Sequence, residues 1–214
     1  MEAYLGTKET WEKTEGELRN LITGKGDTAI EAIGEAAFYG PKIDFMAKDA
    51  IGREWQVATI QLDMNLPERF DLTCVNEKGE KERIVMIHAA IMGSIERFLS
   101  TLIEHTAGIF PTWLSPVQVV VIPVRENHTD TTEKIVSTLK NANIRVEHNI
   151  DTDSLGKRIH AAKKMNTPYI LIIGDKEVES GNITVEGRTE KLENISLESF
   201  VEKISSEVKN RTLN

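Results

Sequence analysis

The sequence predicts two domains of different fold class, an α+β domain followed by an α/β domain. In residues 38–88, apolar and polar side chains alternate with a period of two between short polar turns, which is typical of antiparallel hairpins. Beyond residue 115, apolar strands alternate with amphipathic helices, which indicates a mainly parallel or mixed sheet with helices on its faces. The segment Gly108–Pro116 between them is punctuated by proline and glycine, so the expected domains are residues 1–114 and 115–214.

The first domain is expected to open with a helix and continue with two hairpins. The helix has a loosely amphipathic pattern, and we expect one of its faces to pack on a sheet. In order, the expected elements are a helix over Lys8–Thr23 ended by Gly24–Gly26, strands around Ile43–Phe45 and Trp55–Thr59 joined by Lys48–Gly52, strands Leu72–Val75 and Arg83–His88 joined by Glu77–Glu80, and a helix over Ser94–His105.

The second domain is expected to alternate strands and helices and to end on a helix. Its strands are short β-branched runs, and its helices carry an apolar stripe. In order, the expected elements are a strand over Val117–Ile122, a helix over Thr131–Asn141, a strand over Ile144–Val146, a helix over Ser154–Met165, a strand over Tyr169–Ile173, an edge strand over Ile183–Val185 and a helix over Leu197–Lys209.

Composition excludes several classes of protein. The most apolar stretches, such as Val117–Val124, are far shorter than the roughly 20 residues that cross a bilayer, and the N-terminus is not signal-like. A single cysteine, Cys74, excludes an internal disulfide and suits a reducing compartment, so we expect a cytoplasmic protein without a membrane partner. The net charge of −8 argues against a protein that holds DNA or RNA through bulk electrostatics.

Charge is distributed unevenly between the two halves. Residues 1–114 hold 19 acidic and 12 basic residues, a difference of −7, whereas residues 115–214 hold 15 and 14, a difference of −1. The nearly neutral half contains a basic cluster on one expected helix, formed by Lys157, Arg158, His160, Lys163 and Lys164. On composition alone this cluster is more often a solvated helix face than an RNA contact, and both interpretations stay open.

Candidate functional residues lie on the expected antiparallel sheet. No phosphate-binding glycine loop and no nucleophile elbow is present, so those common enzyme classes are set aside. The sheet instead carries polar side chains, Tyr39, Lys42, Gln56, Gln61 and His88. Strand alternation places Gln56 and Gln61 on opposite faces unless a β-bulge lies between them.

Two of the candidates have more than one reading from the residues alone. Arg97, beside an apolar helix stripe, is either a surface residue whose stem covers apolar atoms or a guanidinium aimed at a phosphate. His88 alone cannot form a zinc site, because zinc takes at least three protein ligands, and a histidine at a strand end is often simply hydrogen-bonded.

Ordered sequence blocks carry a resemblance to a known family. The string Gly93–Phe98, after a strand ending in His88, resembles motif 3 of the class II aminoacyl-tRNA synthetases. Further blocks resemble the threonyl-tRNA synthetase family within that class: Phe38–Phe45, Trp55–Gln56, Thr59–Asp63, Asn65–Phe70 and Phe110–Pro116. Two later blocks, Ser154–Ile159 and Ile173–Glu177, are similar to the anticodon-binding domain of the threonine, proline, histidine and glycine enzymes.

The resemblance implies a fold and an activity. It implies the last portion of an antiparallel class II core, followed by a mixed-sheet anticodon-binding domain with helices on its faces. The activity would be a threonine–tRNA ligase that uses ATP with Mg²⁺ to activate threonine and transfers it to tRNA(Thr). The complete enzyme would be a homodimer, and anticodon contacts would fall on Lys157, Arg158, Glu177 and Arg188.

The resemblance also assigns roles in the core. Arg97 would contact the γ-phosphate with Ser94 in the same pocket, and Gln56 would touch the nucleotide. Lys42 would reach the reacting carboxylate and phosphate, where a fixed positive charge stabilises the negative charge that develops during adenylate formation. Tyr39 and Gln61 would surround the threonine.

Zinc is the family's means of recognising threonine, and His88 resembles the last of its three protein ligands. The other two, a cysteine and a histidine, belong to a region upstream of this sequence, and Cys74 matches neither. Other positions depart from the family pattern: Ala89, Val57, Ala58 and, in the anticodon region, Glu186, which replaces a usual arginine.

The resemblance covers the C-terminal part of the enzyme, without its motifs 1 and 2. We therefore expect that the isolated chain neither activates threonine nor binds zinc tightly, although a split enzyme whose other half is a separate chain stays open. The alternative function is a tRNA-binding or regulatory paralogue without catalysis; the retained Tyr39, Lys42, Gln61, His88 and Arg97 favour the ligase.

Overall fold

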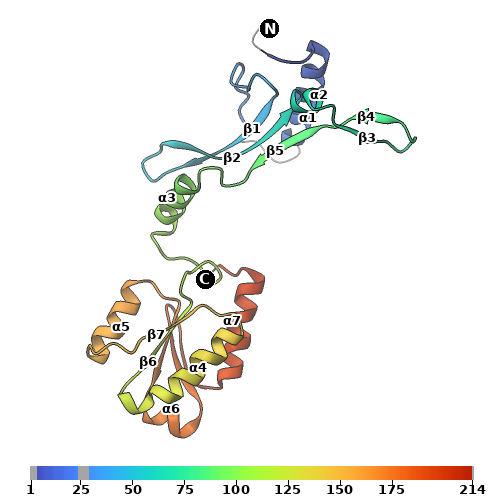
Figure 1. The fold of residues 1–214 in the computed structure, drawn as a ribbon. Coiled ribbons are helices and arrows are strands. Elements are labelled where there is room, and N and C mark those ends of the chain that lie inside the picture. Colours follow the sequence, from blue (N-terminus) through green and yellow to red (C-terminus); the bar gives the residue numbers. More distant parts are fainter. Residues whose placement is uncertain (1–3, 24–28, 214) are drawn as a thin grey trace. The chain divides into compact units, whose positions relative to one another are not determined.

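The computed structural model describes residues 4–23 and 29–213 of the chain, which form two compact units, Met1–His105 and Thr106–Asn214. We refer to them as the first and second units, and Figure 1 colours them along the sequence. None of the helices in the described residues has the length and apolarity needed to cross a membrane.

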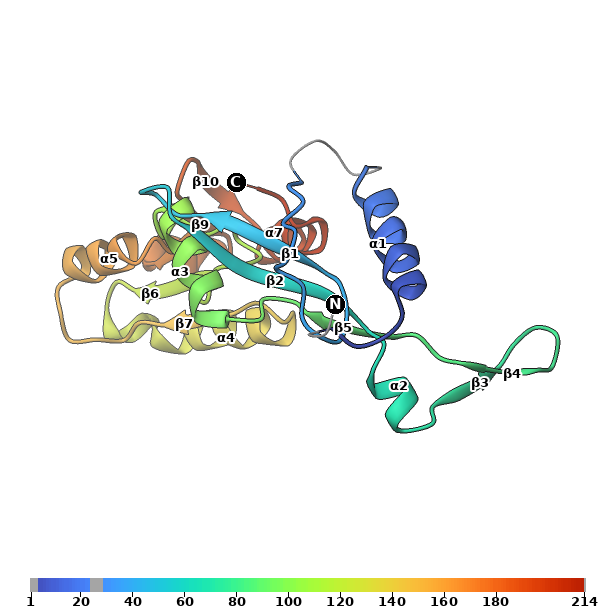
Figure 2. The same cartoon turned by 90° about the horizontal axis from the view of Figure 1, so that it is seen from above.

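The first unit is an antiparallel arrangement of short elements. Its elements are α1 (Lys8–Thr23), β1 (Lys42–Lys48), β2 (Glu54–Asp63), α2 (Leu66–Arg69), β3 (Thr73–Val75), β4 (Lys81–Arg83), β5 (Met86–Ala90) and α3 (Ile95–Thr106). Strands β1, β2 and β5 form an antiparallel sheet in that order, and β3 and β4 form a separate two-stranded ribbon. This ribbon projects from the three-stranded sheet as an arm (Figure 2).

The structure confirms the first helix and the first hairpin and corrects two other expectations. Helix α1 begins and ends where the sequence predicts, whereas the glycine signal at 24–26 lies outside the described residues. The expectation that α1 packs one face on a sheet is wrong, because no residue of α1 is buried. The expected strand Arg83–His88 is two strands: β4 pairs with β3, and β5 leaves the ribbon to pair with β2.

A β-bulge in β2 decides which side chains share a face. Phe45 of β1 pairs with Ala58, but Met46 pairs with Gln56, so Val57 is the extra residue. The bulge therefore turns Gln56 onto the face that carries Thr59 and Gln61. The carbonyl of Val57 accepts a hydrogen bond from the Gly93 amide at 3.0 Å, which ties the start of α3 to the bulge.

Gly40 fixes the segment that precedes β1. The carbonyls of Tyr39 and Pro41 accept hydrogen bonds from the amides of Met64 and Leu62, so this segment runs along the end of β2. A Cβ at Gly40 would overlap the Leu62 carbonyl. Only glycine fits this close approach, and it holds the neighbouring Tyr39 beside the sheet.

The second unit is an α/β domain with a five-stranded mixed sheet. Its elements are β6 (Val119–Pro123), the 3₁₀ turn η1 (Glu126–His128), α4 (Thr129–Asn141), β7 (Val146–His148), α5 (Leu155–Lys164), β8 (Tyr169–Ile173), α6 (Asp175–Ser180), β9 (Ile183–Gly187), β10 (Lys191–Ile195) and α7 (Leu197–Asn210). The strand order is β10-β9-β8-β6-β7; β6 is parallel to β7 and β8, and the β8–β9 and β9–β10 pairs are antiparallel.

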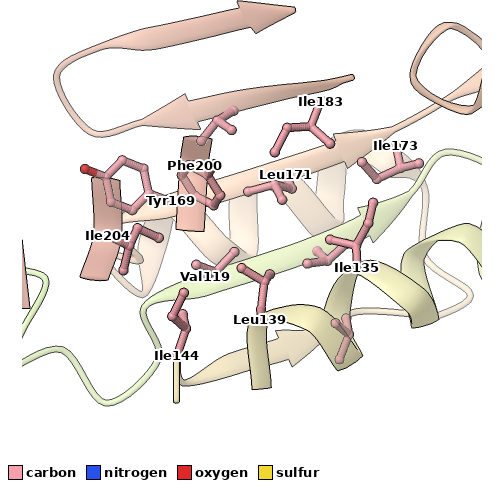
Figure 3. Close-up of a cluster of buried hydrophobic side chains, with 13 residues drawn as sticks. Val119, Ile135, Leu139, Ile144, Tyr169, Leu171, Ile173, Ile183, Phe200 and Ile204 are labelled. Atoms are coloured by element: carbon pink, nitrogen blue, oxygen red, sulfur yellow. The ribbon is translucent and has the colours of Figure 1, made fainter. Parts of the chain in front are cut away.

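Alternate residues of the central strands bury against helices on both faces of this sheet. Val119 and Leu171 on one face pack with residues of α4 and α7, among them Leu139 and Phe200 (Figure 3). On the other face, Val120 and Ile170 pack with α5. Because both faces are covered, β6 reads as a continuous apolar run rather than an alternating one.

The structure corrects the strands at the two sides of this sheet. The expected edge strand Ile183–Val185 lies inside the sheet, because β10 pairs with its outer side. The sequence analysis missed β10, whose residues alternate weakly, and it placed β7 two residues too early. The other expected helices and strands of this domain are present, with small shifts at their ends.

The connecting segment 108–116 belongs to the second unit. Arg145 donates hydrogen bonds to the carbonyls of Trp113 and Ser115, and Gln118 donates to the carbonyl of Thr112 at 2.9 Å. Thr112 and Ser115 are buried. The two units therefore divide at His105 and Thr106, ahead of the boundary at 114 and 115 that the sequence predicts.

Candidate functional site

A pocket of about 390 Å³ lies on one face of the three-stranded sheet. Five candidates from the sequence line it, together with Thr59 of β2: Tyr39, Lys42, Gln56, Gln61 and His88. Lys42 of β1, Gln61 of β2 and His88 of β5 are direct cross-strand partners, so they form one row across the three strands. Directly opposite side chains lie on the same face about 5 Å apart, which explains why residues 46 positions apart meet.

The middle of this row is held by a buried amide. Gln61 is 8% exposed, and its Oε1 accepts a hydrogen bond from the Tyr39 hydroxyl at 2.8 Å. The Tyr39 ring also meets the His88 ring edge to face, with 6.3 Å between centroids. Tyr39 and Gln61 therefore form one wall of the pocket, and their contact with threonine stays a prediction.

Asp63, two residues after Gln61 on β2, orients the His88 side chain. One oxygen of Asp63 lies 2.8 Å from His88 Nε2, and the other accepts hydrogen bonds from the amides of Asn65 and Leu66. Burial acts to raise the pKa of Asp63, but these hydrogen bonds outweigh it and the pKa is lowered. Asp63 stays ionised at neutral pH, and its contact with Nε2 fixes the orientation of the His88 ring.

A second carboxylate, Asp44, lies in the next row of the same face. It contacts Lys42, Gln56 and Thr59. Sequence reasoning singled out neither Asp44 nor Asp63. The available signal for Asp44 was its position two residues after Lys42 on a strand, which places both side chains on one face.

The structure does not bring Ser94 and Arg97 into the pocket. The guanidinium of Arg97 lies 5.7 Å from the Trp55 ring centroid. Trp55 pairs with Ala47 and lies on the opposite face of the sheet from Gln56. Arg97 thus packs against the sheet through an aromatic ring, as arginine does when its plane stacks on a π face. Its contact with a phosphate, and that of Ser94, stay predictions.

The described residues do not fit a complete metal site. No group of three His, Cys, Asp or Glu side chains in residues 4–23 and 29–213 could hold a metal ion. His88 brings one imidazole, and Cys74 lies on the projecting ribbon, where its Sγ is 3.8 Å from Glu82. Tetrahedral zinc with three protein ligands needs two more ligands than this pocket supplies.

In the second unit, the predicted anticodon residues differ in the exposure of their side chains and in their contacts within the unit. Lys157 is exposed and forms an ion pair with Asp153 at 3.3 Å. Arg158, on the same helix, is only 8% exposed and donates to the carbonyl of Asn149. Arg158 is therefore not part of an exposed basic face of α5. Its side chain holds the loop that precedes the helix.

Glu177 and Arg188 also make contacts within the unit. Glu177 accepts a hydrogen bond from the Gly174 amide at the start of α6 and another from Thr184. Arg188 donates to the carbonyls of Phe110 and Asn166 and lies near the Ser115 hydroxyl. Burial lowers the pKa of Arg188. Distant carbonyl partners of this kind have no signature in the sequence.

Charged groups gather where β6 and β8 end. His128, 2% exposed, bonds through Nε2 to Asp175 at 2.9 Å, and Arg125 lies 3.4 Å from the same carboxylate. The hydrogen bond from His128 lowers the pKa of Asp175. Ligands of open α/β sheets bind at the carboxyl ends of parallel strands, so this edge is the candidate ligand surface of the second unit.

Both units match models of known protein families. Residues 4–106 match the tRNA synthetase class II core domain (G, H, P, S and T), and residues 118–207 match the anticodon binding domain.

Among curated proteins, the chain is 48% identical over 213 residues to threonine–tRNA ligase of Thermotoga petrophila and 48% identical over 212 residues to that of Clostridium botulinum. Each alignment covers 99% of this chain and 33% of the relative. The chain therefore spans about a third of the length of these relatives.

Among solved structures, the RNA binding domain of threonyl-tRNA synthetase from Cryptosporidium parvum aligns with a TM-score of 0.84 at 34% identity. This alignment covers 95% of this chain and 52% of that chain. The likeness extends through both units and agrees with the expected fold class, an antiparallel class II portion followed by a mixed-sheet domain.

Proposed function

The chain belongs to the threonyl-tRNA synthetase family of class II aminoacyl-tRNA synthetases, and from this premise we propose that it is the C-terminal part of a threonine–tRNA ligase. It supplies part of the pocket that activates threonine with ATP and Mg²⁺, and a domain that binds the anticodon of tRNA(Thr). The complete ligase is a cytoplasmic homodimer.

The observation that carries this proposal is the cross-strand row of Lys42, Gln61 and His88 beside Tyr39. Threonine activation joins a carboxylate to the α-phosphate of ATP and brings two anions together. An ammonium held by a strand offsets their repulsion without reorganising during the reaction, which is the most effective form of electrostatic stabilisation. Lys42 has this place in the pocket, and Gln56 on the same face contacts the nucleotide.

The polar wall of the pocket recognises the amino acid. The Tyr39 hydroxyl donates a hydrogen bond to the Gln61 amide oxygen, which fixes both side chains. Gln61 thus presents amide donors, and Tyr39 presents its hydroxyl, to a small polar substrate. A site with oriented hydrogen-bonding groups rejects an analogue that lacks the matching hydroxyl far better than an apolar pocket does. His88 contributes one ligand to a zinc site whose other two protein ligands, a cysteine and a histidine, belong to the remaining part of the ligase and not to this chain.

Contacts of Arg97 and Ser94 with the triphosphate stay predictions, because Arg97 lies against Trp55 on the face of the sheet opposite the pocket. The second unit is proposed to bind RNA. There, Lys157 is one of three exposed lysines on α5, with Lys163 and Lys164. The groups at the ends of β6 and β8 offer both charge signs to unpaired bases. RNA contacts that neutralise phosphates weaken as salt rises. Anticodon binding is expected to combine this salt-dependent part with contacts from Glu177.

Two measurements test the proposal. The first is threonine-dependent exchange of pyrophosphate into ATP by the pure chain, with and without the remaining two thirds of a homologous ligase added in trans. We expect no exchange by the chain alone and measurable exchange by the mixture. The second is binding of tRNA(Thr) to the chain, compared with a transcript whose anticodon bases are replaced.

The outcomes separate the alternatives. Exchange by the chain alone would contradict the claim that it is only part of the site. Binding of tRNA without exchange, even in a mixture shown to assemble, would favour a non-catalytic tRNA-binding paralogue. Equal affinity for the two transcripts would contradict an anticodon-binding role for the second unit.

A further inference from the structure

Asp44 lies between the two groups of the pocket that the proposed reaction needs most. Its Oδ2 lies 2.5 Å from Lys42 Nζ, and its Oδ1 accepts hydrogen bonds at 2.8 Å from both Gln56 Nε2 and Thr59 Oγ1. The side chains of Lys42 and Asp44 are 23% and 24% exposed, so water screens this contact only in part. One carboxylate thus holds an ammonium with one oxygen and an amide and a hydroxyl with the other.

The contact with Gln56 depends on the bulge in β2. Asp44 pairs directly with Thr59, and Gln56 reaches the same face only because Val57 is the extra residue. The amide of Gln56 then spans from Asp44 to the Thr59 hydroxyl, which lies 2.6 Å from Nε2. Sequence position alone would send Gln56 to the opposite face, away from Lys42.

These hydrogen bonds leave one atom of Gln56 for a ligand. An ionised carboxylate only accepts hydrogen bonds, so it must face Nε2 and not Oε1 of the amide. The two donors of Nε2 are used by Asp44 and Thr59. The carbonyl Oε1 is the remaining group, and it can accept a hydrogen bond from a donor on a ligand.

We infer that Asp44 is a positioning residue for amino-acid activation, resting on the proposed function of the pocket. It holds Lys42 and Gln56 in their binding geometry before the substrates arrive. It also balances the charge of Lys42 until an anionic carboxylate or phosphate takes its place. Groups fixed in this way lose less entropy on binding, and a misplaced group of this kind costs as much as about 100-fold in rate.

Two substitutions of Asp44 separate its two contacts. Asp44→Asn keeps an oxygen that can accept from Gln56 and Thr59, but its NH₂ group cannot hold an ammonium, so Lys42 is released. Asp44→Ala removes both contacts. The matched control is Asp71→Asn, which alters an exposed aspartate of the same unit whose side chain pairs with Arg83, away from the pocket lining.

The first test is side-chain NMR of the 214-residue chain and needs no catalytic activity. We expect the Gln56 side-chain amide signals to be nearly unchanged in Asp44→Asn, shifted in Asp44→Ala and unchanged in Asp71→Asn, and the Lys42 side-chain signals to move in both Asp44 variants. Backbone amide signals of β1 and β2 report whether the sheet is intact. If the Gln56 and Lys42 side-chain signals do not shift in either Asp44 variant, the inference is overturned.

The second test uses a complete ligase that contains the chain. We expect Asp44→Asn to lower kcat for threonine-dependent pyrophosphate exchange about tenfold while KM for ATP changes less, because the interaction acts on geometry more than on affinity. Wild-type kinetics in Asp44→Asn would overturn the positioning role. An inactive wild-type ligase would contradict the proposed function, and the NMR result would still judge the contacts of Asp44.

Discussion

The two units differ in what they bury. In the second unit, the buried hydrophobic residues form clusters on both faces of the sheet, with Phe200, Leu171 and Ile204 fully buried. In the described part of the first unit, no hydrophobic side chain is buried; the buried residues there are Gly40, Pro41, Gln61, Asp63 and Pro67. Apolar side chains of its sheet and of α3 are instead exposed, among them Phe45, Ile87 and Leu99.

The second unit therefore has a hydrophobic core that stabilises its own fold, whereas the first unit mainly contributes the face of a sheet that carries the pocket. Burial of apolar area is the main favourable contribution to folding, at about 25 cal/mol per Å². The second unit has that contribution, whereas the first unit places polar groups on one face of its sheet and exposed apolar groups on the other. We conclude that the pocket face is ordered by hydrogen bonds and register more than by a core.

Breaking the core of the second unit has the largest expected effect. Phe200→Ala removes a fully buried ring that also meets Tyr169 edge to face, and it should lower the free energy of unfolding by about 3–5 kcal/mol. Urea unfolding followed by circular dichroism measures this change. The matched control, Phe45→Ala in the first unit, changes a ring that is 47% exposed and should cost less than about 1 kcal/mol. Equal costs would contradict the contrast between the units.

Removing the guanidinium of Arg188 tests whether the connecting segment belongs to the second unit. Arg188→Ala removes the guanidinium that donates to the carbonyls of Phe110 and Asn166, of which Phe110 keeps the Ser115 hydroxyl as a donor, and it should lower the free energy of unfolding by about 2 kcal/mol. Amide exchange in residues 108–116 should accelerate, and mass spectrometry measures it. Arg188→Lys, which keeps the charge but can reach only one carbonyl, should restore part of the protection. Unchanged exchange in both variants would detach the segment from the second unit.

The smallest expected effect concerns a buried polar network in the second unit. The Tyr169 hydroxyl donates to Glu207 at 2.7 Å, and Lys203 lies 3.1 Å from the same carboxylate. Burial acts to raise the pKa of Glu207, but hydrogen bonds from Tyr169, Lys203 and Thr112 outweigh it, so its pKa is lowered from the ordinary 4.5. The network therefore stabilises the fold above that value, and its contribution is lost as the pH falls through the lowered pKa.

Glu207→Gln should lower the free energy of unfolding by about 1–2 kcal/mol at pH 7, and by less as the pH falls through the lowered pKa of Glu207, where the wild-type carboxylate takes up its proton. Denaturant unfolding at several pH values measures the two curves. Parallel curves for the wild type and the variant would show that Glu207 does not contribute to the acid dependence.

Much of the fold could be predicted from the sequence because its elements are local. Helix α1 and strand β8 have the bounds that periodicity gives, since each follows one pattern from end to end. Strand β10 was missed because Lys191–Ile195 carries charged residues and gains its place only by pairing with β9. The break between β4 and β5 was missed because it depends on pairing with different strands: β4 pairs with β3, and β5 pairs with β2.

The candidate site could be predicted only in part. Tyr39, Lys42, Gln56, Gln61 and His88 were candidates because they are polar residues of the expected sheet, and the family resemblance supplied their roles. The structure places all five in one pocket. Their supports, Asp44 and Asp63, depend on cross-strand register and on the bulge at Val57, which no local pattern encodes. Arg158 and Arg188 look like surface cations in sequence, but their partners are carbonyls that lie far along the chain or in a preceding loop.

Amide hydrogen exchange of the intact chain tests the contrast between the units most directly, because it reports the opening free energy of each strand separately. We predict that β6 and β8 exchange only through global unfolding of the second unit, while β1, β2 and β5 exchange orders of magnitude faster. Protection of β1, β2 and β5 equal to that of β6 and β8 would contradict the conclusion that the first unit lacks a stabilising core of its own.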